Sequence, residues 1–421
     1  MASTRLRGDA ALALAIFVLG RALVWLRWLA SDRTPGDVEY YFTSTQALPT
    51  QGIATTLVEY PVPVVWMLGI PQLLAPGDRD LHLVLFALLM LAADAAFTWT
   101  LWRRAPRPLL AVSVWSAFLV SMGTITYLRF DMVPAALVGM AVLLSQTRPR
   151  LSGALVATGA AIKLWPAAVA APLLAGTRSR VRRLFLLGFV VAGGSLALAS
   201  LLLTGWERTT SALTWQSERG LQIESIWATP MMLARVMGGE QQVVMSHFKA
   251  FEVTGPGLEQ WMAASTVASF AAILVMGLLL WRGHRMLASA DEATRLSWMA
   301  WAVSALTALV IVTNKTLSPQ YVVWLGAPMV VAIASENSPI RRWILAALCV
   351  AIGAGTQAVY PIWYVPLWAG TADDPATLTA TWILTARNVV LLIGALWLTC
   401  GTWFRSTFRA RYAGSRVREI G

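Results

Sequence analysis

Long apolar stretches separated by short arginine clusters recur along the whole sequence, and this alternation limits the fold more than any other feature. Five stretches exceed the ~18 apolar residues with which a helix crosses a bilayer. They are Ala11–Ala30, Leu81–Trp102, Leu184–Leu203, Met262–Trp281 and Leu378–Cys400. Because 57% of the 421 residues are hydrophobic and only 13% are charged, one soluble core could not bury this apolar surface. The sequence therefore predicts an all-α, polytopic integral membrane protein, since helices satisfy their own backbone hydrogen bonds in lipid.

Several other classes of protein are disfavoured. The first apolar stretch is too long and too rich in Trp for a cleaved signal peptide, so we expect a retained signal-anchor helix. Cys349 and Cys400 both lie in apolar runs, which makes a disulfide framework unexpected. The three histidines lack the spacing of metal ligands. We expect no metal and no other cofactor.

The arginine clusters predict the orientation of the chain. A net charge of +12 could suggest nucleic acid, but arginines gathered between apolar runs are typical of cytoplasmic loops. We assign seven clusters to the cytoplasm and expect no nucleic-acid partner. These clusters are Arg5/Arg7, Arg103/Arg104/Arg107, Arg148/Arg150, Arg178/Arg180/Arg182/Arg183, Arg282/Arg285/Arg295, Arg341/Arg342 and Arg405 through Arg418.

This orientation holds on one condition, which concerns Tyr60–Pro76. The segment is short, contains four prolines and ends in Gly77-Asp78-Arg79-Asp80. If it crossed the membrane, most later arginine clusters would fall outside and violate the positive-inside rule. We therefore expect a juxtamembrane or re-entrant helix here, within a long first outer loop, 32–80.

Two pairs of short apolar arms are predicted to form hairpins. The arms are Leu109–Val120, Met132–Leu144, Leu151–Ile162 and Ala167–Leu174. At ~1.5 Å per residue, arms of this kind reach only part of the ~30 Å hydrocarbon core. Such broken helices are tolerated where the break is buried in protein or lines a wet cavity. Counting these arms, we expect about 12 transmembrane or half-membrane helices.

The whole chain, 1–421, is interpreted as a single membrane domain with both ends in the cytoplasm. Outer loops are expected at 32–80, where catalysis would take place, at 205–260, near 313–318 and at 357–377, and a cytoplasmic tail at 404–421. Against 30 arginines the chain has only three lysines, Lys163, Lys249 and Lys315, and all three fall on the outer side of this topology. Charged residues at membrane depth are costly and so are candidates for function.

Acidic residues in the first outer loop are the first candidates for chemistry. Asp37 and Glu39 lie two residues apart just past a helix end, and Glu59-Tyr60-Pro61 follows in the same loop. A carboxylate in this place could act as a catalytic base or bind a metal. Two solvated loop acids are the commoner explanation of such spacing.

Two hairpin apices carry basic residues. Arg129 and Asp131 could form a helix cap and a local ion pair, or Arg129 could face an anion. Lys163, beside the helix breaker Pro166, could snorkel toward water, but its isolation favours phosphate binding.

Two further polar motifs lie in outer loops. Glu218–Trp227 has the pattern of an interfacial amphipathic helix, which is as often structural as functional. Asn314–Tyr321 combines a lysine, amides and a phenol in a tight turn between membrane helices, a density that favours a ligand-binding role.

Taken in order, six motifs resemble the bacterial members of glycosyltransferase family 87. They are GDVEYY with VEYPVP, LRFDMVPAAL, GAAIKLWPA, ERGLQIESIWATP and NKTLSPQYVVWL, and the resemblance runs from about residue 10 to residue 400. That family has the GT-C fold and includes polyprenyl-phosphate-mannose-dependent α-mannosyltransferases and arabinofuranosyltransferases. The resemblance is to the family and does not specify the sugar.

The resemblance implies an enzyme of the bacterial cell membrane with its active site on the extracytoplasmic face. Its substrates would be a sugar, with mannose as first choice, on a polyprenyl monophosphate, and a glycolipid or glycan acceptor. An acid of the first outer loop would be the general base, and the matching position is Asp37, with Glu39 the second choice. We assign the phosphate of the sugar donor to Arg129, Lys163, Lys315, Gln320 and Tyr321. We assign acceptor or sugar binding to Glu39, Tyr40, Glu59, Tyr60, Asp131, Arg219, Gln222 and Glu224.

One base without a covalent nucleophile implies direct displacement with inversion, and cations in a cavity would stabilise the departing phosphate. A transporter or flippase of a lipid-linked saccharide is the alternative, since broken helices and buried cations also suit transport sites. The sequence shows no obvious internal repeat of the kind many transporters have. A membrane scaffold without catalysis is the third hypothesis, and it does not require basic residues at outer apices.

Overall fold

The computed structural model describes residues 2–31, 36–217 and 219–418, and within these ranges eight helices are long and apolar enough to cross a membrane. They belong to α1 (Ala2–Leu29), α5 (Arg79–Arg104), α6 (Pro108–Met122), α10 (Ser179–Ser217), α12 (Leu258–Leu287), α13 (Glu292–Thr313), α15 (Pro339–Gln357) and α17 (Pro375–Arg418). Four shorter apolar helices complete the bundle: α7 (Met132–Leu144), α8 (Pro149–Ile162), α9 (Pro166–Leu174) and α14 (Tyr321–Ser335). The prediction of a polytopic helical membrane protein is confirmed.

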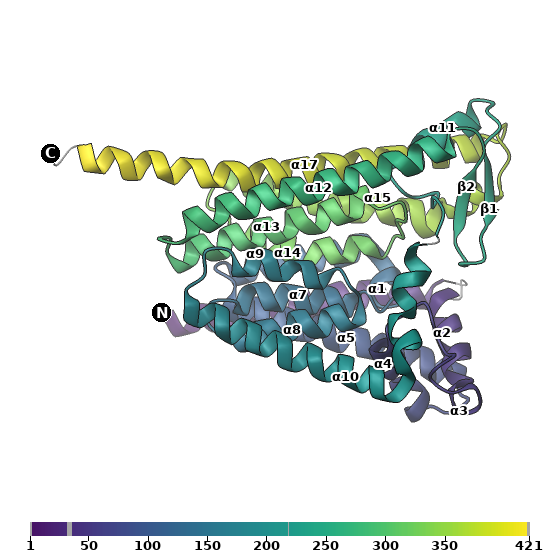
Figure 1. The fold of residues 1–421 in the computed structure, drawn as a ribbon, viewed down its shortest axis with the longest axis horizontal. Coiled ribbons are helices and arrows are strands. Elements are labelled where there is room, and N and C mark those ends of the chain that lie inside the picture. Colours follow the sequence, from purple (N-terminus) through teal and green to yellow (C-terminus); the bar gives the residue numbers. More distant parts are fainter. Residues whose placement is uncertain (1, 32–35, 218, 419–421) are drawn as a thin grey trace.

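Short elements gather at one end of this bundle, which we call the hairpin end (Figure 1). They are α2 (Gly36–Gln46), α3 (Leu48–Gln51), α4 (Val62–Leu74), the 3₁₀ turn η1 (Gly123–Thr126), α11 (Thr229–Val236), strands β1 (Gln242–Met245) and β2 (Phe251–Thr254), the π-helical turn η2 (Ala358–Ile362) and α16 (Tyr364–Ala369). Both chain termini lie at the opposite end, which we call the termini end (Figure 1). The segment predicted not to cross, 60–76, contains α4, which lies at the hairpin end near α2 (Figure 1).

The two strands form the only sheet within the described residues, and the sequence did not predict it. They pair antiparallel, with Gln242 opposite Thr254 and Met245 opposite Phe251. The tight connection between them requires a left-handed backbone at Lys249, whose φ is 54°. This conformation is uncommon for a residue other than glycine. The tip of the hairpin reaches α2, where the Nζ of Lys249 lies 3.9 Å from the centre of the Tyr40 ring.

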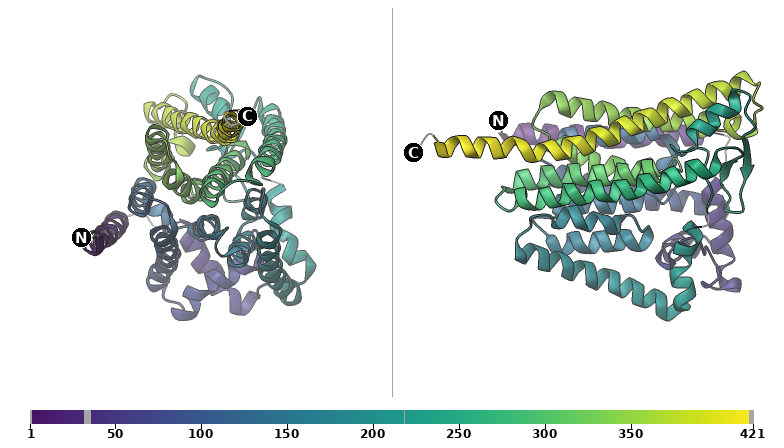
Figure 2. Two further views of the ribbon diagram at one scale, coloured as in Figure 1. Left: turned by 90° about the vertical axis from the view of Figure 1, so that its left-hand side faces the viewer. Right: turned by 45° about the horizontal axis from the view of Figure 1, so that its top comes forward.

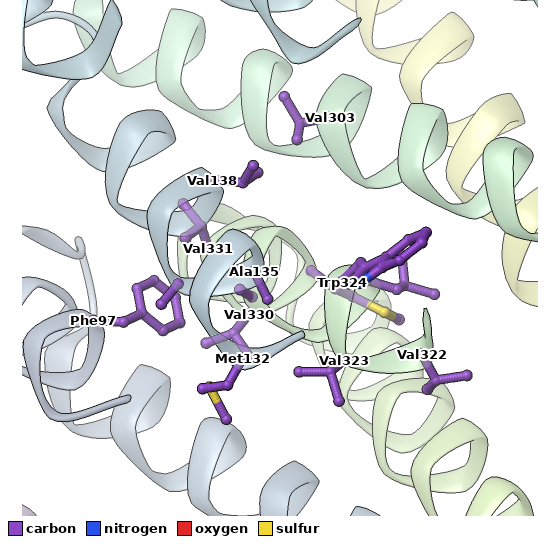
Figure 3. Packing of buried hydrophobic residues seen from close by; sticks show 14 of the residues in the cluster. Phe97, Met132, Ala135, Val138, Val303, Val322, Val323, Trp324, Val330 and Val331 are labelled. Atoms are coloured by element: carbon purple, nitrogen blue, oxygen red, sulfur yellow. The ribbon is translucent and has the colours of Figure 1, made fainter. Parts of the chain in front are cut away.

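The centre of the bundle is α14, every residue of which is buried. Figure 3 shows Val322, Val323 and Val330 of α14 in the same cluster as Phe97 of α5 and Met132 of α7. By contrast, α10 and α12 present rows of exposed apolar side chains outward, as helices in contact with lipid do. Figure 2 shows α1 at the edge of the bundle and α17 extending beyond the other helices at the termini end.

A buried ion pair joins α1 to α5 and supports the turn that follows η1. Arg21 donates to both carboxylate oxygens of Asp94, at 2.7 and 2.8 Å. The same carboxylate accepts hydrogen bonds from Trp115 Nε1 and from the hydroxyl of Tyr127, each at 2.7 Å. Buried charges require such partners, because an unpaired one is costly. Tyr127 is thereby held in place two residues before Arg129.

Candidate active site

A cavity of about 750 Å³ opens at the hairpin end of the bundle, where segments far apart in the sequence meet. It is bounded by the start of α2, the turns at 127–131 and 163–165, the loop at 314–320 and the tip of the β1–β2 hairpin. Ten of the fourteen residues assigned from the sequence line it: Asp37, Tyr40, Glu59, Tyr60, Arg129, Lys163, Arg219, Gln222, Gln320 and Tyr321.

Asp37 and Arg129 form an ion pair in this cavity. Asp37 lies in the first turn of α2, and Arg129 lies in the turn between η1 and α7. The Nε of Arg129 is 2.9 Å from a carboxylate oxygen of Asp37. The arginine side chain is 9% exposed, whereas that of Asp37 is 35% exposed. The buried guanidinium of Arg129 therefore holds the Asp37 carboxylate in place, and part of that carboxylate stays exposed to the cavity.

Lys163 occupies an aromatic box deeper in the same cavity. It caps the end of α8, and its Nζ is 4.9 Å from the ring centres of Phe130, Tyr321 and Trp324. Cations are attracted to the faces of aromatic rings at such distances. The Nζ also lies 2.5 Å from a carboxylate oxygen of Asp131. That oxygen accepts a second hydrogen bond from Trp324 Nε1, at 2.6 Å.

The roof of the cavity is tied to its wall through Tyr40. The Tyr40 hydroxyl donates a hydrogen bond of 2.7 Å to Glu59, and the Nζ of Lys249 lies 3.9 Å from the centre of the Tyr40 ring. Burial, and after it the hydrogen bond to Glu59, raises the pKa of the Tyr40 phenol above its ordinary value. Tyr40 therefore stays protonated and continues to donate to Glu59.

Positive charge exceeds negative charge on the cavity wall. Four side chains of Lys or Arg line it, Arg129, Lys163, Arg219 and Lys249, against the carboxylates of Asp37 and Glu59. Within the described part of the chain, no carboxylate lies within ion-pair distance of Arg219 or Lys249. The buried amide oxygen of Gln320 also lacks a hydrogen-bond partner there. The cavity thus suits an anion that also offers hydrogen-bond donors.

The other four assigned residues do not line the cavity. Glu39 forms an ion pair of 2.6 Å with Arg79, and Asp131 lies behind Lys163 with 1% of its side chain exposed. Lys315 contributes its carbonyl oxygen to the backbone N–H of Gln222 at 3.1 Å, and burial lowers the pKa of its ammonium group. Its side chain does not line the cavity.

Glu224 is fully buried and faces Arg387 of α17, with 3.2 Å between their charged atoms. Burial raises the pKa of Glu224 to about 7, while the charge of Arg387 opposes this shift. The side-chain amide of Asn388 donates to the backbone carbonyl oxygens of Glu224 and Ser225. This cluster joins the 219–228 segment to α17, below the cavity wall.

The prediction of an amphipathic helix at Glu218–Trp227 is wrong for the residues that the structure describes, and Glu218 lies outside them. The segment is a series of turns with an isolated bridge from Gln222 to Glu252. The backbone N–H of Ile223 donates to the carbonyl of Phe251 in β2. The backbone N–H groups of Gln222 and Ile223 bond to neighbouring segments, so they cannot form helical hydrogen bonds.

Sequence reasoning missed several side chains of the cavity. Trp215, His247 and Phe248 form an aromatic group in its lining, in which the ring centres of His247 and Phe248 are 3.7 Å apart. Tyr360 accepts a long hydrogen bond, 3.4 Å, from Arg129. Lys249 was recognised only as an outer lysine. Its position depends on strand pairing, for which four-residue strands gave no usable signal.

Comparison with known proteins gives one match. Residues 57–255 match the model of Glycosyltransferase family 87. This range includes Glu59, Arg129, Lys163 and the hairpin tip, while Asp37 and the 314–321 loop lie outside it. No curated protein and no solved structure matches the chain.

Proposed function

We propose that this chain, a glycosyltransferase that carries a family 87 domain over residues 57–255, transfers a sugar from a polyprenyl-monophosphate donor with inversion. The acceptor is a lipid- or polymer-linked glycan on the outer face of the membrane, and mannose is the first choice of sugar. The observation that carries the proposal is the cavity whose wall carries a partly exposed carboxylate, Asp37, together with four cationic side chains.

The proposed reaction has one chemical step. An acceptor hydroxyl attacks the anomeric carbon of the donor, and its proton goes to the Asp37 carboxylate. The bond between the anomeric carbon and the phosphate oxygen breaks, and the electron pair leaves with the polyprenyl phosphate. A base within hydrogen-bond reach of the hydroxyl accelerates such a step. Because the nucleophile enters opposite the leaving group, the anomeric configuration is inverted.

The cations of the cavity account for the leaving group. Negative charge grows on the phosphate as the bond breaks, and preorganised cations in a site of low dielectric stabilise it with little rearrangement. Lys163 and Arg129 already have carboxylate partners, so they are held in fixed positions. Arg219 and Lys249 bring the additional positive charge that a phosphate monoanion or dianion requires. We assign the phosphate to the region between these four side chains.

The first test replaces the proposed base. Asp37→Asn keeps the size of the side chain but cannot accept the proton, so transfer of mannose from polyprenyl-phosphate-mannose to a membrane glycolipid fraction should fall by about 10²-fold or more. Asp80→Asn is the matched control, because Asp80 lies at the same end with a side chain that is 89% exposed. Both proteins are purified and compared for stability before the assay.

The results separate the hypotheses. Loss of transfer in Asp37→Asn with normal transfer in Asp80→Asn supports the assignment of the base. Transfer by Asp37→Asn near the wild-type rate would remove Asp37 from that role. Movement of the lipid-linked sugar across a proteoliposome membrane without any product would favour the transporter hypothesis instead.

A further inference from the structure

A second cavity, of about 360 Å³, lies at the termini end and shares no residue with the candidate active site. It is formed where the α5–α6, α12–α13 and α14–α15 connections meet α17. In the orientation predicted from the arginine clusters, this end is at the cytoplasmic surface. In that orientation the cavity is at the depth of the lipid headgroups of the cytoplasmic leaflet.

The floor of this second cavity is a neutral pair, Arg405 with Glu336. The Glu336 side chain is 1% exposed and contacts the guanidinium of Arg405 closely. Glu336 also accepts a hydrogen bond of 2.8 Å from the backbone N–H of Ser338, and Arg405 donates to the Ser297 hydroxyl at 2.5 Å. Glu336 is the only carboxylate among the described residues that line the cavity, and the charge of Arg405 balances it.

Two other arginines of the lining then provide unbalanced positive charge. Arg341 is 50% exposed and shares the Glu336 carboxylate with Arg405, at a distance of 3.5 Å, so three arginines of the lining stand against one carboxylate. Arg107 donates one hydrogen bond of 2.7 Å to the carbonyl of Ala334 and one of 3.3 Å to the side chain of Asn337. A guanidinium has five N–H groups, so both arginines keep free donors.

Exposed apolar side chains lie in the lining of this cavity and next to it in the sequence. Phe404 lines the cavity and is 58% exposed, and on α15 the side chains of Ile340 and Trp343 are 73% and 60% exposed. In a membrane protein, exposed apolar side chains of this size face lipid, and Trp is enriched at the membrane interface. A cationic cavity with such side chains beside it could take a headgroup and the first part of its acyl chains together.

We propose that this second cavity binds the phosphate of an anionic membrane phospholipid. Arg341 and Arg107 hold the phosphate oxygens, for which guanidinium groups offer paired N–H donors. The acyl chains lie along Ile340, Trp343 and Phe404. The site is independent of the sugar-transfer chemistry proposed above, because it lies at the other end of the bundle.

Native mass spectrometry of the purified full chain tests this proposal with two probes, dioleoyl-phosphatidylglycerol and dioleoyl-phosphatidylcholine. Wild type should retain the anionic lipid at lower concentration than the zwitterionic one. Arg341→Gln should weaken retention of phosphatidylglycerol roughly tenfold, which corresponds to about 1.4 kcal/mol, because it removes a charge-assisted hydrogen bond to the phosphate. Arg341→Lys should recover part of it. Arg150→Gln is the matched control, because Arg150 is an exposed residue in the α7–α8 arginine cluster at the same end, outside the cavity.

Three results would overturn the proposal. Equal retention of both lipids would remove the requirement for net negative charge. Equal loss in Arg150→Gln and Arg341→Gln would show that the lipid responds to overall charge and not to this cavity. The third result is that inorganic phosphate raises the thermal unfolding temperature of wild type but not of Arg341→Gln. That result, without retention of phospholipid, would assign the cavity to a soluble phosphate.

Discussion

Replacing Lys163 by methionine would separate the structural role of this lysine from its proposed role in binding phosphate. Lys163 and Asp131 form a close pair whose side chains are 16% and 1% exposed. Lys163→Met fills the aromatic box with an apolar chain of similar length, but it leaves the Asp131 carboxylate buried with only the Trp324 N–H as a strong partner. Removing one partner of a buried ion pair costs about 3–5 kcal/mol.

The double variant Lys163→Met/Asp131→Asn removes both charges. The new amide oxygen can still accept the hydrogen bond from Trp324 Nε1, so no buried charge remains. Replacement of a whole buried pair is often close to neutral for stability. We therefore expect the double variant to recover most of the free energy of unfolding that the single variant loses.

The assay measures reversible unfolding in mixed micelles together with the rate of sugar transfer. Recovered stability with transfer still reduced by about 10²-fold would assign Lys163 to the leaving group, in line with the loss of one preorganised donor at a developing anion. Recovered stability with full transfer would refute the phosphate role. Equal stability of the single and double variants would refute the buried-pair energetics.

Three further predictions concern the rest of the site. Glu224 has a pKa raised by burial from 4.5 to about 7 in the folded protein, so its stabilising contribution is complete below about pH 4.5 and is lost as the pH rises through about 7. Glu224→Gln should flatten the pH dependence of thermal stability over this range, and an unchanged slope would contradict the shift. Lys249→Gln should weaken binding of the polyprenyl-phosphate sugar by about tenfold at low ionic strength and by less at high salt, because screening weakens exposed charges. An effect independent of salt, measured as KM, would argue against a charge-based role. Tyr40→Phe removes one hydrogen bond to Glu59 and should cost about 1 kcal/mol in a denaturation assay with little loss of kcat. Loss of transfer beyond about tenfold would indicate that the hydroxyl of Tyr40 contacts substrate.

The sequence could predict the helical bundle and the location of Asp37 and Lys163 at the same end of it, for one physical reason. Water and lipid constrain every span in the same way, so hydropathy and arginine clusters locate all hairpin apices at once. Asp37, Arg129 and Lys163 were each expected near an apex or helix end of the same side, and all three line one cavity. Long-range packing was not needed for that inference.

The parts that sequence reasoning missed depend on pairing between distant segments. The Glu218–Trp227 pattern favoured a helix, but its backbone N–H groups bond to Lys315 and to β2. The turn at Lys249 lacks the Gly or Asn that usually marks a left-handed residue, so the hairpin gave no local signal. The buried pair of Arg21 and Asp94 joins residues 73 positions apart, and neither spacing nor periodicity connects them.

The complete burial of α14 has a consequence for how the protein is made. With 15 residues, this helix is about 22 Å long, which is short of the ~30 Å hydrocarbon core. Helices α6, α7, α13 and α15 surround it, so its flanks are never bordered by acyl chains in the finished bundle. During synthesis α14 leaves the ribosome before α15, so we expect it to stay beside α13 or at the insertion machinery until α15 is made. Membrane integration of α14 therefore depends on packing against its neighbouring helices, because protein side chains surround it where lipid surrounds an outer helix.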